Sequence, residues 1–274
     1  MSKSTYLFYD VMNYPIPFNK EFFAYEKILT TVKKPGDVDF SRWKKCPSMQ
    51  SFVDHVNKLG WLWKSLPFVD AIYIGNSMTF NSLKEDSDID LCIVVSPGRM
   101  WLAKSWSNIA LLVLWLRRRR SYSYKKFNLN FYIDSNSLNL QSIKYNHSDP
   151  YLIYRLAHLV PMYHRLEEQR LDIYEHNYWL REYLPTFPME HVIQLWTKIH
   201  IWSTNVKRVT ERLLWWLFWD LVERSIKIVL LPCLMWKKKR LGPLWDSLII
   251  SDHMLKFHMD KRREYAMKWK IAWR

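Results

Sequence analysis

The stretch IGNSMTFNSLKEDSDIDLCIVV, residues 74–95, decides the fold class predicted for this chain. Gly75 ends one apolar run, and about a dozen residues later Asp88 and Asp90 open a second apolar run. Side chains two residues apart on a strand project from the same face, so these two carboxylates are expected side by side, with the alternate apolar residues anchored in the core. The stretch therefore predicts two buried strands with a carboxylate pair at one end.

Neighbouring patterns extend this unit in both directions. Residues 51–66 and 100–116 have helical length, and the second segment contains no helix breaker. Strand patterns stand at residues 68–75, 88–95 and 127–134, where β-branched and aromatic residues gather between turn signals. The predicted fold class is α/β, with a small mixed sheet.

The chain is predicted to have three parts. Residues 1–49 are expected to form a short helical N-terminal extension, and residues 50–148 the α/β core. Patterns from residue 149 onward are mostly helical, with LPTFP at 184–188 as a break between two helical blocks. Residues 149–274 are therefore predicted to form a helical C-terminal domain.

The charge balance indicates an anionic partner. The 274-residue chain carries 41 Lys and Arg against 26 Asp and Glu, and its formal net charge is +15. Basic runs stand at residues 117–120 and 237–240. Nucleic acid, a nucleotide or an acidic lipid surface would suit this charge, and a solvated basic face is the alternative for either run.

Cysteine usage and the N-terminal residues predict a cytoplasmic protein. Cys46, Cys92 and Cys233 are widely separated and include no CxxC pair, which argues against a disulfide framework and a structural zinc site. Asp10 and Asn13 stand where a signal peptide needs an unbroken apolar core.

The apolar segment at residues 213–236 is predicted to be an amphipathic helix packed on protein rather than a membrane span. Asp220, Glu223 and two basic residues lie in its middle, where charges are costly in a bilayer, and Pro232 would interrupt it. An interfacial helix is the alternative, because a basic run follows. No integral membrane segment is expected.

Tryptophan and glycine occur in unusual numbers. The chain has 16 Trp but only 5 Gly, whereas glycine normally makes up roughly 7% of residues. Aromatic-rich packing is one explanation. The other is a genome that reads a stop codon as glycine, in which case some Trp positions would be glycine in the native protein.

The paired carboxylates suggest a site for a divalent cation. Mg²⁺ prefers oxygen ligands and shares them with substrate phosphates, and two such ions about 4 Å apart can stabilise the attacking and leaving oxygens of a phosphoryl displacement. Gly75 allows backbone N–H groups to approach a phosphate closely, and Asn76 and Ser77 can bond its oxygens. A two-ion site usually needs a third carboxylate.

This arrangement resembles the nucleotidyltransferase superfamily of the DNA polymerase β type, whose motif is a glycine turn, a spacer and a DxD pair. The resemblance implies that Asp88 and Asp90 bind Mg²⁺ or Mn²⁺ and that Gly75 belongs to the triphosphate-binding turn. It also implies that Ser87 is the motif's Ser before the first Asp. Asn76 departs from the usual Gly or Ser, and Phe80 stands near a frequent second glycine.

Nearly the whole chain looks like a group of uncharacterised, predicted bacterial nucleotidyltransferases. The similar segments are YLFYDVMNYPIPFNKEFF, DSDIDLCIVVSPGRMWL, KKFNLNFYID, AHLVPMYHR, NYWLREYLP and MLKFH. The start of those proteins resembles a winged helix-turn-helix, which would be truncated here. The resemblance names no acceptor.

The third carboxylate of the superfamily is expected on a later strand, flanked by apolar residues. Its best match here is Asn130, between Leu129 and Phe131. An amide can offer one carbonyl oxygen to a metal but adds no charge. Asp134 lies four residues on along the strand, about 13 Å away, which is too far for a simple substitute.

A loop rich in basic and aromatic residues precedes this strand. Interleaved rings and cations suit single-stranded nucleic acid, and an exposed polar loop is the alternative. The residues that could contact a polyanion are Arg117, Arg118, Arg119, Arg120, Lys125 and Lys126.

These features predict an enzyme that transfers a nucleoside monophosphate from a nucleoside triphosphate to a hydroxyl of an unknown acceptor, with RNA among the candidates. No general base is assigned. The alternative is a catalytically lapsed relative that binds nucleic acid or regulates, supported by Asn130 and the net charge. A peripheral membrane protein that uses residues 213–240 is a third class.

Overall fold

The computed structural model describes most of the chain from residue 48 to residue 257. The described residues are 48–80, 82–119, 121–144, 149–166, 172–184, 199, 211, 216–241 and 248–257. The predicted N-terminal extension, except its last two residues, lies outside them, as does Arg120.

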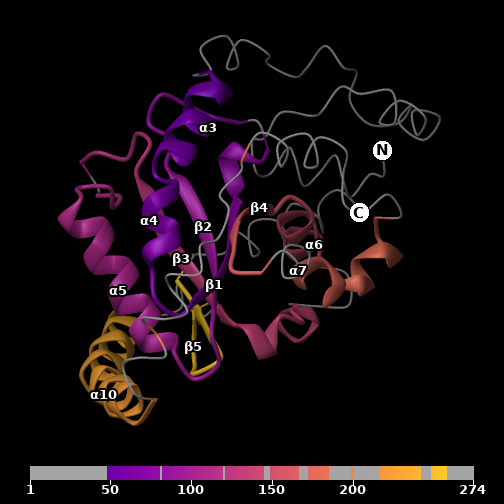
Figure 1. The fold of residues 1–274 in the computed structure, drawn as a ribbon. Coiled ribbons are helices and arrows are strands. Elements are labelled where there is room, and N and C mark those ends of the chain that lie inside the picture. Colours follow the sequence, from indigo (N-terminus) through magenta and orange to yellow (C-terminus); the bar gives the residue numbers. More distant parts are fainter. Residues whose placement is uncertain are drawn as a thin grey trace, which may run out of the picture.

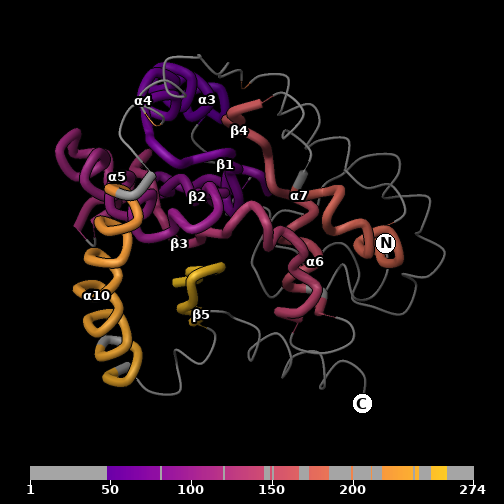
Figure 2. The backbone as a smooth tube through the Cα atoms, turned by 60° about the horizontal axis from the view of Figure 1, so that its bottom comes forward, coloured from indigo at the N-terminus to yellow at the C-terminus, as the bar shows by residue number. Residues whose placement is uncertain are grey.

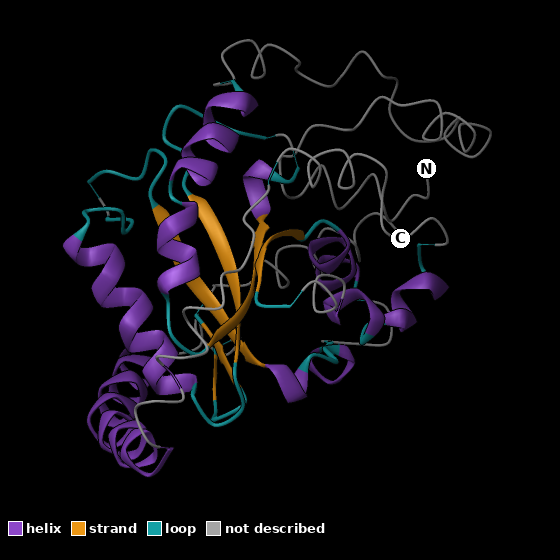
Figure 3. Cartoon of the chain, viewed as in Figure 1, coloured by secondary structure: helices purple, strands orange, loops and turns teal. Residues whose placement is uncertain are grey.

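A mixed sheet forms the centre of the described structure, and it confirms the predicted α/β class (Figures 1 and 3). Its spatial order is β4-β1-β2-β3-β6-β5. Strands β2 and β3 pair in parallel, and the other neighbouring pairs are antiparallel. The strands are β1 (Val69–Gly75), β2 (Ile89–Val95), β3 (Phe127–Asp134), β4 (Val160–His164), β5 (Ile249–Ile250) and β6 (Met254–Lys256).

The central strands are apolar because both of their faces are covered. Every residue of β1 is buried, and so is every residue of β2 except Asp90. A strand that is buried on both faces reads as a continuous apolar run rather than an alternating one. Figures 1 and 2 both show helices α5 and α10 on the left of the strands and α6 on their right.

The helices follow the predicted pattern with two differences. The helix expected at residues 51–66 is divided at Leu59 into α3 and α4, and the helix expected at 100–116 ends earlier, at Val113. The described α-helices are α3 (Met49–Lys58), α4 (Gly60–Ser65), α5 (Met100–Val113), α6 (Pro150–Ala157), α7 (Asp172–Glu175) and α10 (Trp216–Leu241).

Residues after 148 contribute strands as well as helices. Strand β4 pairs with β1, and β6 pairs with β3, so both belong to the same sheet as the core strands. The boundary predicted after residue 148 therefore cuts through one sheet. These strands are short, and β5 has two residues, which is below the length at which a sequence pattern can be recognised.

Helix α10 is held against α5 by polar contacts. The Glu223 carboxylate accepts hydrogen bonds from the backbone N–H groups of Trp101 (2.8 Å) and Leu102 (2.7 Å), in the first turn of α5. A carboxylate here satisfies N–H groups that have no partner within the helix and complements the helix dipole. Burial nevertheless raises the pKa of Glu223.

The helix α10 is continuous over 26 residues and includes Pro232, so the predicted interruption at this proline was wrong. Apolar side chains on α10 that remain exposed include Phe218, Leu221 and Ile228. Among the helices that the structure describes, none combines the length and apolar character needed to cross a membrane.

Trp115 occupies a backbone position that normally belongs to glycine. Its φ is +57°, in the left-handed region. The N–H of Trp115 bonds to the carbonyl of Leu112 (3.1 Å), and the N–H of Leu116 bonds to that of Leu111 (2.8 Å). These two bonds define a Schellman motif at the end of α5, with Trp115 at the position where glycine is most common. The side chain of Trp115 is 69% exposed.

Replacing Trp115 with Gly is expected to stabilise the protein by about 1 kcal/mol, because glycine adopts the left-handed conformation without steric cost. The exposed ring gives up its stacking with Arg119, whose guanidinium carbon lies 4.5 Å from the ring centroid. Chemical denaturation would measure the change. The matched control is Trp106→Gly, at an exposed position inside α5, which should destabilise by about 1 kcal/mol.

A destabilising Trp115→Gly change would contradict this account of the helix end. A genome that reads a stop codon as glycine, the second explanation for the many tryptophans, makes a further prediction that does not depend on stability. Peptide mass spectrometry of the protein from its natural source should then find glycine at residue 115.

Candidate functional site

The site begins where β1 ends beside the start of β2. Gly75 and Asp90 are paired in the antiparallel register of these strands. Asn76 follows with φ +60°, a left-handed conformation that Asn tolerates better than most residues. From this position the Asn76 amide nitrogen donates a hydrogen bond to Asp90 Oδ2 at 2.6 Å. The turn therefore aims a polar side chain at the carboxylate.

Two carboxylates converge on one amide of β3. Asn128 Nδ2 lies 2.9 Å from Asp88 Oδ2 and 3.0 Å from Asp90 Oδ1. Asp88 immediately precedes β2, and Asp90 pairs with Asn128 in the parallel β2–β3 register. The predicted juxtaposition of Asp88 and Asp90 is present, and the parallel neighbour strand completes it.

A β-bulge brings Asn130 to the same carboxylate. Leu91 pairs with Leu129 and Cys92 with Phe131, so Asn130 is an extra residue in β3. Its Nδ2 donates to Asp90 Oδ1 at 3.1 Å. Bulges redirect side chains and are frequent beside active sites. Asn130 therefore lies where the third ligand was expected, in contact with Asp90.

An arginine side chain of the basic loop contacts one of the two acids. The backbone at Arg117 forms a parallel bridge with Phe127, which ties the loop to the start of β3. Arg118 Nε then lies 3.2 Å from Asp88 Oδ2, with the arginine side chain half exposed. Within the described part of the loop, Arg118 is the arginine that contacts the acids.

Burial and mutual repulsion raise the proton affinity of both acids. Burial, followed by the neighbouring Asp88 carboxylate, raises the pKa of Asp90 to about 6, against the opposing effects of the Asn76 amide and Arg155. Burial also raises the pKa of Asp88, although the Arg118 charge acts in the opposite direction. A divalent cation between the two groups would relieve both effects.

The raised pKa of Asp90 predicts a pH-dependent stability. The protonated carboxyl favours the folded state, so its stabilising contribution is present below the usual pKa near 3.8 and is lost as the pH rises through about 6. Relative to Asp90→Asn, the wild type should lose on the order of 1–3 kcal/mol of unfolding free energy between pH 4.5 and 7.5. Urea denaturation with a chelator present would measure this. A pH-independent difference would contradict the inferred burial of the charge.

Several residues predicted for the site have other contacts. The Ser87 hydroxyl accepts from the Lys84 N–H at 2.7 Å and closes the turn before β2. The Ser77 carbonyl accepts from the Ser82 N–H at 2.8 Å. Gly75 is extended, with φ −134°, and a Cβ there would lie 3.2 Å from Leu159 Cδ2, so packing accounts for the glycine.

The two lysines of the basic loop also contact other groups of the protein. Lys125 Nζ donates to the Ser51 hydroxyl and lies 5.4 Å from the centroid of the Phe52 ring. Lys126 Nζ donates to the Trp115 carbonyl at 2.5 Å. At the far end of β3, Asp134 accepts hydrogen bonds from the N–H groups of Asn136 and Gly98, which identifies a turn cap rather than a third ligand.

Asn128 is the site residue that the sequence reasoning missed. The signal was present in FNLNFYID, where Asn128 and Asn130 stand two residues apart like Asp88 and Asp90. Matching a single apolar-Asp-apolar pattern selected Asn130 alone. Asn128 contacts both acids, and this contact could be recognised only from the register of β2 against β3.

The residues at the site fit one Mg²⁺ better than two. Mg²⁺ binds to one or two carboxylates and otherwise to phosphates and water, and Asp88 and Asp90 supply two. Asn128 and Asn130 can each present an oxygen if the amide rotates by half a turn, but neither brings a charge. Within the described ranges, no group of three or more His, Cys, Asp or Glu residues is placed to hold a metal.

A cavity adjoins the acids on the α6 side. Its volume is about 90 Å³, and its mostly apolar lining includes Gly75, Asn76 and Asp90. Arg155 and Lys256 also line it. Arg155 is close enough to lower the pKa of Asp90. The glycine turn, one acid and two cations thus share a cavity.

Compared with models of protein families, with curated proteins and with solved structures, the chain matches none.

Proposed function

We propose that the protein is a metal-dependent nucleotidyltransferase that uses Mg²⁺ or Mn²⁺. The observation that carries the proposal is the convergence of Asp88 and Asp90 within 3.0 Å of one amide nitrogen, Asn128 Nδ2. Paired carboxylates that are partly buried and have raised pKa values are a frequent feature of functional sites.

The reaction would move a nucleoside monophosphate to an acceptor hydroxyl. The hydroxyl oxygen attacks the α-phosphorus and forms a new P–O bond, while the bond from that phosphorus to the bridging oxygen of the β-phosphate breaks. Pyrophosphate leaves with the bonding electron pair, and the hydroxyl proton passes to solvent or to a carboxylate. A bound Mg²⁺ would supply charge stabilisation to the phosphoryl oxygens.

The chain's own groups would position the nucleotide. Asn76 is held by its bond to Asp90 beside the cavity that contains Arg155 and Lys256. These two cations suit the oxygens of a triphosphate, and Asp88 and Asp90 would hold the metal that accompanies it. Positioning and electrostatics carry most of the rate in phosphoryl transfer.

A catalytically lapsed relative that binds nucleic acid is the second candidate. It is favoured by the ion pair of Arg118 with Asp88 and by the two amides in place of a third carboxylate. In this case the arginine supplies the positive charge that a metal would otherwise bring to Asp88.

The discriminating experiment is incubation of the protein with each labelled nucleoside triphosphate, Mg²⁺ or Mn²⁺, and cellular RNA or lysate. Label transferred to an acceptor, with pyrophosphate released and with dependence on the metal, supports the enzyme. Metal-independent binding of nucleic acid without any transfer supports the lapsed relative. RNA is one acceptor to examine, and label in protein or small molecules would assign another.

A further inference from the structure

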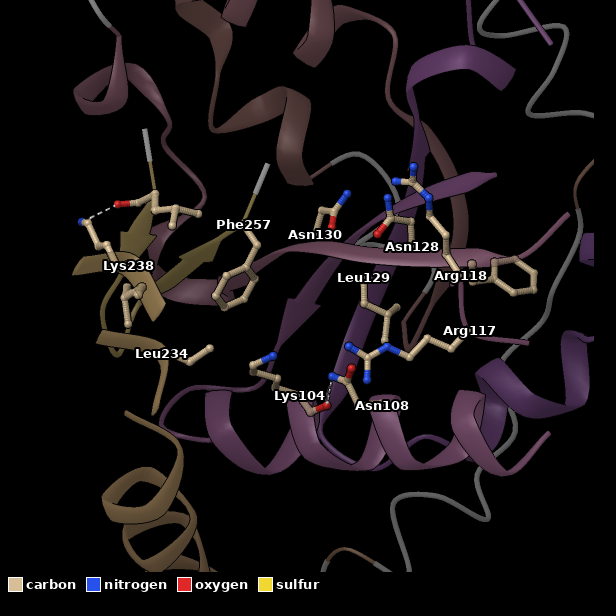
Figure 4. Close-up of a pocket in the computed structure, with 13 residues that line it drawn as sticks. Lys104, Asn108, Arg117, Arg118, Asn128, Leu129, Asn130, Leu234, Lys238 and Phe257 are labelled. Carbon is tan, nitrogen blue, oxygen red and sulfur yellow. Dashed lines mark hydrogen bonds between the residues drawn. The ribbon is translucent and has the colours of Figure 1, made fainter. Parts of the chain in front are cut away.

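A second, larger pocket opens at the edge of β3. Strand β6 pairs with β3 from Phe131 to Ile133, and the Phe257 N–H bonds to the Asn130 carbonyl at 2.8 Å. The loop at Arg117 bridges Phe127, so the short stretch of β3 between these contacts borders a pocket of about 270 Å³. Helices α5 and α10 and strand β5 form the other walls (Figure 4). The residues that line it are Lys104, Asn108, Arg117, Arg118, Phe127, Asn128, Leu129, Asn130, Leu234, Lys238, Leu248, Ile250 and Phe257.

The lining is basic. Two lysines and two arginines contribute to it, and among the described residues that line it none is Asp or Glu. A recess lined by one sign of charge, with apolar walls, focuses the field and attracts an ion of opposite charge. Arginine in particular suits the oxygens of a phosphate.

The two lysines that line the pocket belong to helices that pack against each other. Lys104 projects from α5, and its ammonium lies 4.6 Å from the centroid of the Phe257 ring and 5.6 Å from that of the Tyr132 ring. Lys238 projects from α10, where it donates to the Leu248 carbonyl at 2.8 Å. Because Glu223 of α10 accepts hydrogen bonds from the first turn of α5, the two helices that carry these lysines are held together.

The pocket reaches both faces of β3. In Figure 4 the charged ends of Lys104 and Arg117 lie below the strand on the side of Leu129, whereas Asn128 and Asn130 lie above it. The upper pair are the amides that bond to Asp90. A ligand bound between Lys104 and Arg117 can therefore extend past the edge of β3 at Leu129, between the contacts at Phe127 and Asn130, toward the carboxylates.

Asn130 is shared between this pocket and the smaller one that contains Gly75 and Asp90. The smaller pocket is lined by Asp90, and the larger one by Asn128 and Asn130, whose amides bond to Asp90. Transfer of a group between two substrates requires two binding pockets beside the reacting atoms, one for the donor and one for the acceptor.

We propose that the pocket at the edge of β3 binds the phosphate of a phosphorylated acceptor, with Lys104 and Arg117 as the main contacts. The acceptor's hydroxyl, several bonds away from that phosphate, then reaches the Asp88–Asp90 pair. The apolar wall formed by Leu129 and Phe257 accommodates the carbon skeleton between the two groups. The assignment to the acceptor rests on the proposed nucleotidyltransferase function, but the binding of a phosphate ester does not.

Calorimetric titration with ribose 5-phosphate, without nucleotide or metal, tests the site itself. Lys104→Gln and Arg117→Gln should each weaken binding about tenfold or more. Arg119→Gln changes the same loop at a residue outside the pocket, and Lys239→Gln does so on α10, so both should bind within about twofold of the wild type. Absence of binding to the wild type, or equal affinities in all four variants, would overturn the proposal.

Further titrations identify the source of the phosphate and the role of the pocket. A 5′-phosphorylated oligoribonucleotide that binds at least tenfold more tightly than its 5′-hydroxyl counterpart identifies an RNA end, and tight binding of ribose 5-phosphate alone identifies a small molecule. Nucleoside triphosphate with Mg²⁺ should bind Lys104→Gln and the wild type equally. Loss of triphosphate binding in that variant would assign the pocket to the donor and overturn the acceptor role.

Discussion

Asp90→Asn is expected to reduce nucleotidyl transfer by about a thousandfold or more, because it removes a charge from a site that holds two carboxylates for one cation. Asp90 accepts hydrogen bonds from three amides, those of Asn76, Asn128 and Asn130, so it is the centre of the cluster. Asp88→Asn should have a comparable effect on rate. Both variants should also lose metal-dependent nucleotide binding while they remain folded.

The matched control for this prediction is Asp86→Asn. Asp86 is an exposed acid in the same turn, and its backbone carbonyl, rather than its carboxylate, accepts a hydrogen bond from Ser123. Its replacement should change the rate by less than about threefold. Circular dichroism and chemical denaturation would confirm that each variant folds. Unchanged nucleotide affinity in Asp88→Asn and Asp90→Asn would remove the site assignment.

Asn128→Asp is the substitution with the largest expected effect on stability. It places a third carboxylate against two others and replaces two donated hydrogen bonds by repulsion. In the presence of a chelator it should therefore destabilise the fold by roughly 3 kcal/mol. Mg²⁺ should restore much of this loss, because the cation neutralises the cluster and binds more tightly to three charges than to two. Denaturation with chelator and with Mg²⁺ would measure both effects.

Asn130→Asp should follow the same pattern with a smaller loss, because Asn130 Nδ2 donates to one of the two acids, Asp90, whereas Asn128 Nδ2 donates to both. Asn139→Asp is the control, since Asn139 is exposed and its side-chain oxygen accepts from the Gln141 N–H, a role that Asp fills equally well. An Asn128→Asp protein as stable as the wild type in chelator would show that this amide does not lie between the acids.

The same two substitutions separate the candidate functions. A lapsed enzyme should gain transfer activity or Mg²⁺ affinity when the third charge is added at residue 128 or 130. A competent enzyme adapted to neutral amides should gain little or lose rate, because the added charge draws the metal from its working position. Transfer assays on the Asp variants with saturating Mg²⁺ distinguish the two.

The sequence alone determined the elements that bear the acids. Apolar runs identified β1 and β2, partial alternation identified β3, and the period of two along a strand placed Asp88 and Asp90 together. These features depend on residues within one segment, so local pattern was sufficient.

Only the tertiary structure decided what surrounds the acids. The parallel register of β2 against β3 and the bulge at Asn130 brought two amides to Asp90, and the bridge at Arg117 brought Arg118 to Asp88. Strand β6 joined the sheet from more than a hundred residues away and pairs only with the second half of β3, beside the larger pocket. Pairing and register are set by the burial of whole strand faces and by backbone bonds between distant segments, and a local pattern of residues does not contain these energies.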